Sequence, residues 1–148
     1  NWETAGKVGN PLDLVYDGAI YEGLEAAVAE LSAFAKANKL KTEIRTSSRV
    51  DVSIQNDYFN VLPPLASKDF FARVKASKFS LLFLPEGKRY GLTKLYELAA
   101  CQNPILAIGK ESNWSEMIEE KSLGHLIDVD QLTEGLSKAT DQTIQSGP

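Results

Sequence analysis

The sequence is poor in cysteine and histidine, and it has no excess of basic charge and no long apolar run. Each of these scarcities argues against a class of protein. One cysteine, Cys101, leaves no disulfide framework and no cysteine-rich metal site. The 16 Lys and Arg residues against 20 Asp and Glu residues give a net charge of −4, which argues against broad electrostatic binding to nucleic acid. No apolar run approaches the roughly 20 residues that span a bilayer, and no signal peptide is evident.

What the sequence does contain is typical of one globular domain. Its 148 residues are 43% hydrophobic and 24% charged, which is an ordinary composition for a chain that can bury a real core. We expect a lead-in or former linker over residues 1–11, one folded domain over 12–140 and a flexible tail over 141–148. The first residue is Asn1 and not methionine, which fits a piece of a larger protein.

The chain is organised around the stretch from Phe79 to Gly109. An apolar run over 79–84 and a second over 104–108 flank a helical pattern that begins near Leu92. Because both runs are apolar at nearly every position, they are typical of strands in a parallel sheet that helices cover on both faces. The loop between the first run and the helix lies at the carboxyl end of a strand, where such sheets bind ligands.

The same alternation of strands and helices extends over the whole domain. We predict six strands with helices between them, over residues 12–16, 39–46, 58–62, 79–84, 104–108 and 124–129. This order predicts an α/β fold, a doubly wound parallel six-stranded sheet with helices on both faces. The strand over 39–46 alternates apolar and charged residues, so we expect one of its faces to be exposed to solvent and the strand to lie near the sheet edge.

Several smaller features accompany this pattern. Ser67 and Asp130 are the expected N-caps of the helices that follow them. Val50 and Val52 are candidates for a brief extra strand. A further helix is expected over 112–121, with its apolar side facing inward.

The most informative loop leads into the central helix, which opens with Gly91-Leu92-Thr93-Lys94. The amides of a first helical turn lack partners inside the helix and face the positive end of its dipole, so they favour phosphate. Lys88 and Arg89 add positive charge. Glu97 lies one turn further along, where its carboxylate can accept hydrogen bonds from ribose hydroxyls. This spacing predicts a nucleotide site, and the alternative is that these charges are solvated surface groups.

The dipeptide Gly18-Ala19 follows the first strand, and its amides are candidates to meet the same diphosphate from across the cleft. A plain strand-terminating turn is the alternative. The segment over 18–23 is neither G-x-G-x-x-G nor a phosphate-binding loop that ends in Gly-Lys-Ser/Thr, which argues against a dinucleotide dehydrogenase and an ATPase. His125 lies at the start of a strand, far from this edge, and we expect it to be structural or exposed.

A family resemblance rests on the central helix, Tyr90-Gly91-Leu92-Thr93-Lys94-Leu95-Tyr96-Glu97-Leu98-Ala99-Ala100, and on Pro104-Ile105-Leu106-Ala107 after it. Together they resemble the donor-binding core of GT-B fold glycosyltransferases of the glycogen-synthase-like group. The segment over 14–21 is similar to the strand that opens the C-terminal domain of that family. The resemblance covers residues 12–140 and implies the Rossmann-like C-terminal half of a GT-B fold.

The resemblance also implies a function. The domain would bind a nucleotide-diphosphate-sugar such as a UDP- or GDP-sugar, and the whole enzyme would transfer a hexose to a carbohydrate or lipid-linked acceptor, as in bacterial polysaccharide biosynthesis. By position, Gly18 and Ala19 would face the diphosphate, the amides of Gly91, Leu92, Thr93 and Lys94 would hold it together with Lys88 and Arg89, and Glu97 would bind the ribose. Residues near 62–67 would flank the base. The resemblance assigns no catalytic residue to this domain, and we expect no metal and no cofactor.

The partners follow from the same resemblance. The acceptor site is expected in an N-terminal Rossmann-like domain outside this chain, so we expect the isolated domain to be inactive. We expect no nucleic-acid partner. The expected location is the cytoplasm, with contact to the inner face of a membrane left open.

Two alternatives remain. The family often has a second glutamate upstream of the ribose-binding one, and that position falls on Arg89, which fits a degenerate transferase-like domain kept for protein contacts. A flavodoxin-like or receiver-like interaction module is the other alternative. Such a module would need an acidic pair after the first strand, where Asp17 is single, and a phosphate-accepting aspartate where Pro63-Pro64 stands.

Overall fold

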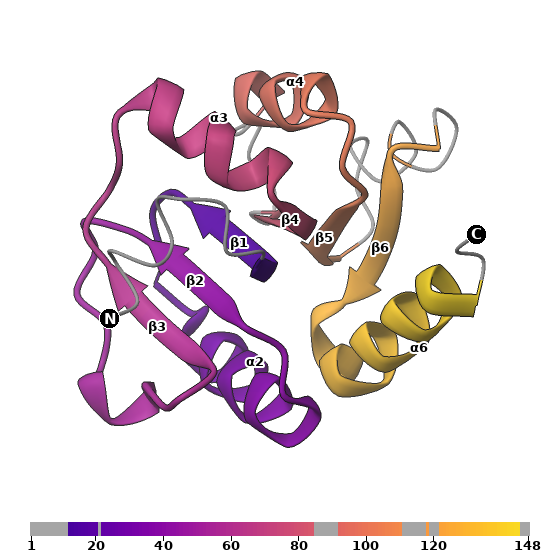
Figure 1. The fold of residues 1–148 in the computed structure, drawn as a ribbon. Coiled ribbons are helices and arrows are strands. Elements are labelled where there is room, and N and C mark those ends of the chain that lie inside the picture. The colour runs from indigo at the N-terminus through magenta and orange to yellow at the C-terminus, as the bar shows by residue number, and fades with distance from the viewer. Residues whose placement is uncertain (1–11, 21, 85–91, 111–117, 119–121, 146–148) are drawn as a thin grey trace.

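A single parallel sheet runs through the middle of the molecule (Figure 1). The structure is a computed structural model that describes residues 12–20, 22–84, 92–110, 118 and 122–145. Within these ranges six strands are ordered β3-β2-β1-β4-β5-β6, with the bounds Leu12–Asp17 (β1), Thr42–Arg45 (β2), Phe59–Leu62 (β3), Ser77–Phe83 (β4), Ile105–Gly109 (β5) and Gly124–Asp128 (β6). All five strand pairs are parallel, which confirms the predicted doubly wound α/β fold.

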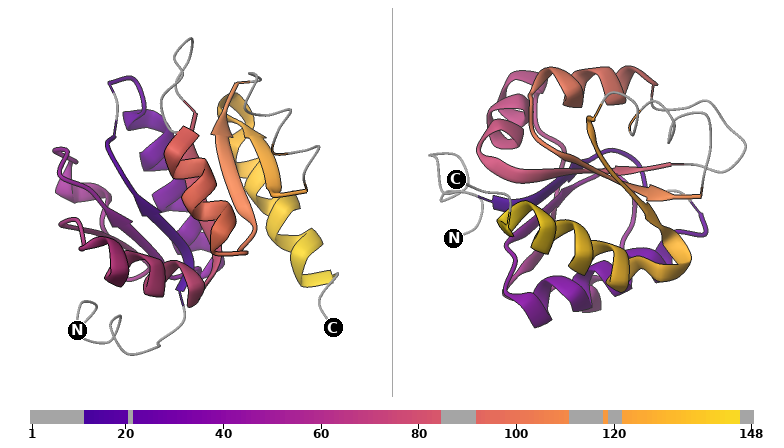
Figure 2. Two further views of the ribbon diagram at one scale, coloured as in Figure 1. Left: turned by 90° about the horizontal axis from the view of Figure 1, so that it is seen from above. Right: turned by 90° about the vertical axis from the view of Figure 1, so that its right-hand side faces the viewer.

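Helices cover both faces of this sheet. The described helices are Glu25–Asn38 (α2), Ser67–Lys75 (α3), Leu92–Ala100 (α4) and Leu132–Gln145 (α6), with short 3₁₀ turns at Val52–Ile54 (η1) and Val129–Gln131 (η2). In Figures 1 and 2, α2 and α6 lie on one face, and α3 and α4 lie on the other. Because parallel strands need crossover connections, each helix returns the chain to the same edge from which the next strand starts.

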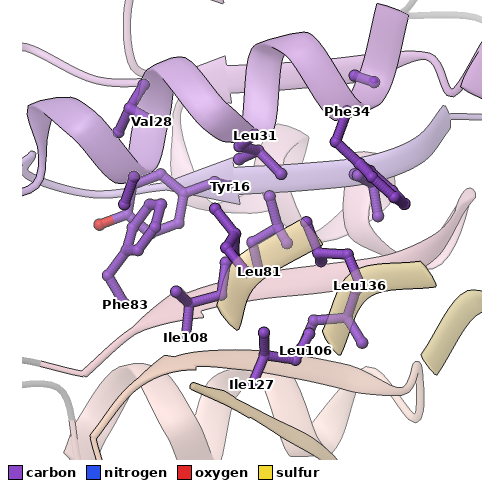
Figure 3. Close-up of a cluster of buried hydrophobic side chains, with 14 of the residues drawn as sticks. Tyr16, Val28, Leu31, Phe34, Leu81, Phe83, Leu106, Ile108, Ile127 and Leu136 are labelled. Carbon is purple, nitrogen blue, oxygen red and sulfur yellow. The ribbon is translucent and has the colours of Figure 1, made fainter. Parts of the chain in front are cut away.

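The core between the sheet and the pair α2 and α6 is built from alternate residues of the strands. In β4, Leu81 and Phe83 are buried on this face, whereas Leu82 is buried on the opposite face. Figure 3 shows Leu81 and Phe83 together with Leu31 of α2 and Leu136 of α6. The period of two that defines a strand is therefore present, although the sequence is apolar at both sets of positions.

The second core lies between the sheet and the pair α3 and α4. Val74 of α3, Leu98 of α4 and Ile105 of β5 are fully or almost fully buried there. The helix predicted over 112–121 lies outside the described residues except for Ile118. That residue is buried in the same cluster, as the predicted inward-facing side requires.

The prediction that one face of the second strand is exposed to solvent is wrong. All four residues of β2 are buried, and the exposed fractions of Glu43 and Arg45 are 0% and 1%. Inside the protein, Glu43 forms ion pairs with Arg45 and with Arg73 of α3. The extra strand suggested for Val50 and Val52 is also wrong, because this segment leads into η1 with Val52 exposed.

Two predicted helix caps are wrong as well. Ser67 is the first residue of α3, and the N-cap position belongs to Ala66. Asp130 lies inside the 3₁₀ turn η2, which the carboxylate of Asp128 caps by accepting a hydrogen bond from the amide of Asp130 at 2.9 Å. Asp130 is therefore not the N-cap of α6, which begins at Leu132. The helix α6 itself extends to Gln145, past the point at which the sequence predicts a tail.

The amino-terminal edge of the sheet is held by close backbone contacts. A Cβ atom on Gly124, the first residue of β6, would overlap the backbone of Ile105 in β5. Nearby, the side-chain amide of Asn103 donates to the carbonyl oxygen of Ser77 at 2.6 Å and also to that of Val74. These contacts join the start of β4 to the turn before β5, on the edge opposite to the predicted site.

Candidate functional site

The reversal of strand order occurs between β1 and β4. From β1 the chain adds β2 and β3 on one side, and then β4, β5 and β6 on the other. The connections that leave the carboxyl ends of β1 and β4 therefore diverge to opposite faces of the sheet, which is the arrangement that forms a ligand crevice in doubly wound folds. This brings the Gly18-Ala19 turn after β1 to the same edge of the sheet as the carboxyl end of β4.

The turn after β1 has a specific backbone geometry. The φ angle of Gly18 is +153°, and a Cβ atom there would lie 2.8 Å from the hydroxyl oxygen of Tyr16. That hydroxyl donates a hydrogen bond to the carbonyl oxygen of Ala19 at 2.6 Å. Gly18 is required because a side chain would displace the tyrosine that closes the turn.

The two amides of this turn differ in what they can bind. The amide of Gly18 donates to the carbonyl oxygen of Arg45 at 3.0 Å and so continues the ladder between β1 and β2. The amide of Ala19, an exposed residue, has no acceptor among the residues that the structure describes. The predicted pair of amides is thus reduced to that of Ala19.

An aromatic contact connects the two strands of the switch point. The rings of Tyr16 and Phe83 meet edge to face, with centroids 4.8 Å apart and an interplanar angle of 69° (Figure 3). Tyr16 is the next-to-last residue of β1, and Phe83 is the last residue of β4. This pair fixes the spacing of the two strand ends from which a site at this edge would be built.

The loops after β1 and β2 are joined by hydrogen bonds. The hydroxyl oxygen of Ser48 accepts from the amide of Ile20 at 3.0 Å, and the amide of Ser48 donates to the hydroxyl oxygen of Thr46 at 3.0 Å. Beyond them lies an open hollow of about 450 Å³ between the loops that follow β2 and β3, lined among others by Thr46, Ser48, Gln55, Pro63 and Pro64. The hydrogen bond from Ile20 to Ser48 therefore joins the connection after β1 to a loop that lines the hollow.

The start of α4 lies where the sequence predicts it. Leu92, Thr93 and Lys94 form the first turn of this helix, and Glu97 lies in its second turn, half-buried. The predicted residues Lys88, Arg89 and Gly91 lie outside the described residues. The structure thus places Gly18, Ala19 and the α4 backbone at one edge of the sheet.

A second charged group lies at the same edge, beyond β5 and β6. Lys110 forms ion pairs with Asp128, at 3.3 Å, and with Asp130. Hydrogen bonds to Asp130 and Asp128 raise the pKa of the Lys110 ammonium group. The amide of Asp130 and the side chain of Lys110 lower the pKa of the Asp128 carboxyl. The charge of Lys110 is therefore matched locally.

The charged cluster under α3 was missed by sequence analysis. The Nε atom of Arg45 lies 2.6 Å from one oxygen of Glu43, and the Nη2 atom of Arg73 lies 2.6 Å from the other. The Nη1 atom of Arg45 donates to the carbonyl oxygen of Pro63 at 3.1 Å. The only signal in the sequence is the spacing of two between Glu43 and Arg45, and this spacing is equally typical of a solvated strand face.

Comparison with solved structures identifies the same fold in a UDP-GlcNAc 2-epimerase, a heptosyltransferase and a glycosyltransferase. A UDP-GlcNAc 2-epimerase from Neisseria meningitidis, solved with UDP-GlcNAc bound, superposes over 98% of this chain with a TM-score of 0.65 and 13% identity. The E. coli heptosyltransferase WaaC with ADP superposes over 94% with a TM-score of 0.58 and 12% identity. The glycosyltransferase GlyE of Streptococcus pneumoniae superposes over 91% with a TM-score of 0.55 and 15% identity.

These similarities concern the fold, and they concern part of each protein. The chain spans 39%, 46% and 32% of the lengths of these three structures. No protein-family model matches the sequence, and no curated protein matches it. The resemblance to one Rossmann-like half of a GT-B fold is thereby confirmed for the fold. Within the described ranges, the helices are too short or too polar to cross a bilayer.

Proposed function

We propose that this chain is the domain of a glycosyltransferase that binds the nucleotide-diphosphate-sugar donor. The observation that carries this proposal is the shared edge at the switch point. There the amide of the exposed residue Ala19 and the first turn of α4 lie at the divergent ends of β1 and β4. Two solved proteins of the same fold hold UDP-GlcNAc and ADP, which supports a diphosphate of this class as the ligand.

In this proposal each group has a separate role. The amides of Leu92, Thr93 and Lys94 and the amide of Ala19 would hold the diphosphate, because unpaired amides at a helix start favour an anion. Lys88 and Arg89 would add positive charge. These groups would stabilise the departing diphosphate, and this would be the contribution of the domain to catalysis. Such stabilisation needs no metal ion.

Calorimetric titration of the chain with UDP, GDP and ADP tests the proposal. We expect weak binding of at least one of them, and we expect Lys94→Ala to weaken it. Lys36→Ala is the matched control, because it removes the same charge from the last turn of α2, far from the proposed site. Absence of heat with all three nucleotides, together with an unchanged melting temperature, would contradict the proposal.

The activity of the intact protein is a further step of the same proposal. The acceptor would bind in a second, N-terminal Rossmann-like domain, and the isolated chain would turn over no donor. We place the intact protein in the cytoplasm. Glu97 would bind the ribose, so we expect Glu97→Ala to lower transfer by the intact protein. If the activity is unchanged, this role for Glu97 is wrong.

A second candidate is a nucleotide-sugar epimerase. It is favoured by the TM-score of 0.65 with an epimerase, against 0.58 and 0.55 with the two transferases. The two activities differ in their need for an acceptor. The intact protein can be incubated with a UDP-sugar alone and followed by proton NMR. An epimerase would convert the sugar while it stays attached to the nucleotide, whereas a transferase requires an added acceptor.

A further inference from the structure

We propose that Arg45 is a positioning residue for nucleotide binding. It joins the turn that carries Ala19, through the ladder between β1 and β2, to the Pro63-Pro64 turn that lines the hollow. The inference rests on the proposed function, because it concerns the same site. It assigns a role to a residue that would not itself touch the nucleotide.

The contacts of Arg45 reach three elements at once. Its carbonyl oxygen accepts from the amide of Gly18 at 3.0 Å, and its Nη1 atom donates to the carbonyl oxygen of Pro63 at 3.1 Å. Its Nε atom pairs with Glu43 at 2.6 Å, and Glu43 in turn holds Arg73 of α3 at 2.6 Å. One residue thus ties together the loops after β1 and β3 and, through Glu43, the helix that follows.

Because Arg45 is buried, it would position other groups and would not touch the nucleotide itself. The residue is 1% exposed and is not among the residues that line the hollow. Two neighbours of Arg45 do line it: Pro63, whose carbonyl oxygen accepts from Arg45, and Thr46, the next residue along the chain. A ligand in the hollow would meet these loops, and their separation would depend on Arg45.

A contribution to stability alone does not explain why a charged cluster of Arg45, Glu43 and Arg73 is buried here. Two guanidinium groups face one carboxylate in a buried layer, and buried ion pairs are often no more stabilising than well-packed apolar residues. A guanidinium is nevertheless suited to fixing geometry, because its planar fork presents several donors in fixed directions. Lysine carries its charge on one flexible ammonium group and would not hold Glu43 and Pro63 in the same way.

Three variants of the chain test the inference, with affinity for UDP, GDP and ADP and the urea denaturation midpoint as readouts. Arg45→Met removes the link to Pro63 and leaves Glu43 paired with Arg73. Arg45→Lys keeps the charge and removes the fork. Asn103→Leu is the control, because it breaks partly buried hydrogen bonds at the opposite edge of the sheet.

For the nucleotide that the unmodified chain binds, we expect Arg45→Met and Arg45→Lys each to weaken affinity by about tenfold or more, the scale expected when a binding group is displaced. We expect Asn103→Leu to lower the denaturation midpoint and leave affinity within about twofold.

Affinity of both Arg45 variants within twofold of the unmodified chain would overturn the inference while the proposed function stands. So would an equal loss of affinity in Asn103→Leu, because the effect would then be one of general stability. If Arg45→Lys alone binds with the affinity of the unmodified chain, the effect of Arg45 is one of charge. This result would also overturn the positioning role. No binding by the unmodified chain would overturn the proposed function itself, and the inference with it.

Discussion

The hydroxyl group of Tyr16 donates a 2.6 Å hydrogen bond to the carbonyl oxygen of Ala19, three residues further along the chain. The tyrosine ring at the same time packs against Phe83 of β4. One side chain therefore holds the turn after β1 and also the spacing between β1 and β4. Because the proposed site lies between these two strand ends, changes to this side chain should affect both stability and binding.

Tyr16→Phe removes the hydrogen bond and keeps the ring. We expect a loss of about 0.5–1.5 kcal/mol in the free energy of unfolding, the usual contribution of one hydrogen bond, and weaker nucleotide binding because the turn at Ala19 is less fixed. Urea denaturation and calorimetry measure the two effects. Tyr96→Phe is the control, because Tyr96 is 56% exposed on α4. Equal effects in the two variants would show that the Tyr16 hydroxyl has no special role.

Gly18→Ala should be more harmful than Gly23→Ala. Both glycines lie in the connection between β1 and α2 and have positive φ angles, +153° and +95°, but a Cβ atom at Gly18 meets Tyr16 whereas one at Gly23 has nothing within 4 Å. We expect the backbone strain of about 1–3 kcal/mol in both variants. Only Gly18→Ala should also disturb Tyr16 and reduce nucleotide affinity. Thermal denaturation and titration provide the comparison, and equal affinity in the two variants would contradict it.

Glu43→Gln should be among the most destabilising single changes in this chain. It removes the carboxylate that faces both Arg45 and Arg73 in a buried layer, and breaking a buried pair in this way costs about 3–5 kcal/mol. The free energy of unfolding in urea measures the loss. Glu134→Gln, on an exposed residue of α6, makes the same chemical change and should have little effect. A loss below about 1 kcal/mol in Glu43→Gln would mean that water or rearrangement compensates the two guanidinium groups.

Asp128 should give a pH-dependent contribution to stability. Its pKa is lowered in the native protein, first by the amide of Asp130 and then by Lys110. A depressed native pKa means that the ionised carboxylate stabilises the fold above the unfolded value of about 3.9, and that this contribution is lost as the pH falls through the native value. Asp128→Asn should therefore lower the melting temperature at pH 6, and the difference from the unmodified protein should shrink as the pH falls below about 3.9. A difference that does not change with pH would assign the effect to shape and not to charge.

Much of the fold was predictable because apolar runs report burial directly. The continuous run over 79–84 predicts a strand covered on both faces, and β4 has buried residues on both. The spacing of Leu132, Leu136 and Ala139 predicts the inner face of α6, and all three are buried. Helix caps were less predictable, because the donors at a helix start can find partners far away in sequence. The first turn of α6 is an example, where the amide and hydroxyl of Thr133 donate to Glu30 of α2.

The site was predictable only where it depends on topology. Any parallel sheet places its strand-to-helix loops at one edge, so the strand order alone brings Gly18 and the start of α4 to the same edge. The part played by Arg45 could not be predicted, since an alternating charged strand has the same sequence whether it faces water or a partner on α3. The hydrogen bond that the Gly18 amide donates within the sheet could not be predicted either, because it depends on the register between β1 and β2.

Gly124 has a consequence for how the sheet is assembled. The first residue of β6 lies so close to the backbone of Ile105 that a side chain cannot fit there. If β6 slipped by one residue along β5, Leu123 or His125 would enter that position, and the strand would be repelled. The outermost strand can therefore dock in one frame only, and mispaired intermediates would dissociate instead of accumulating.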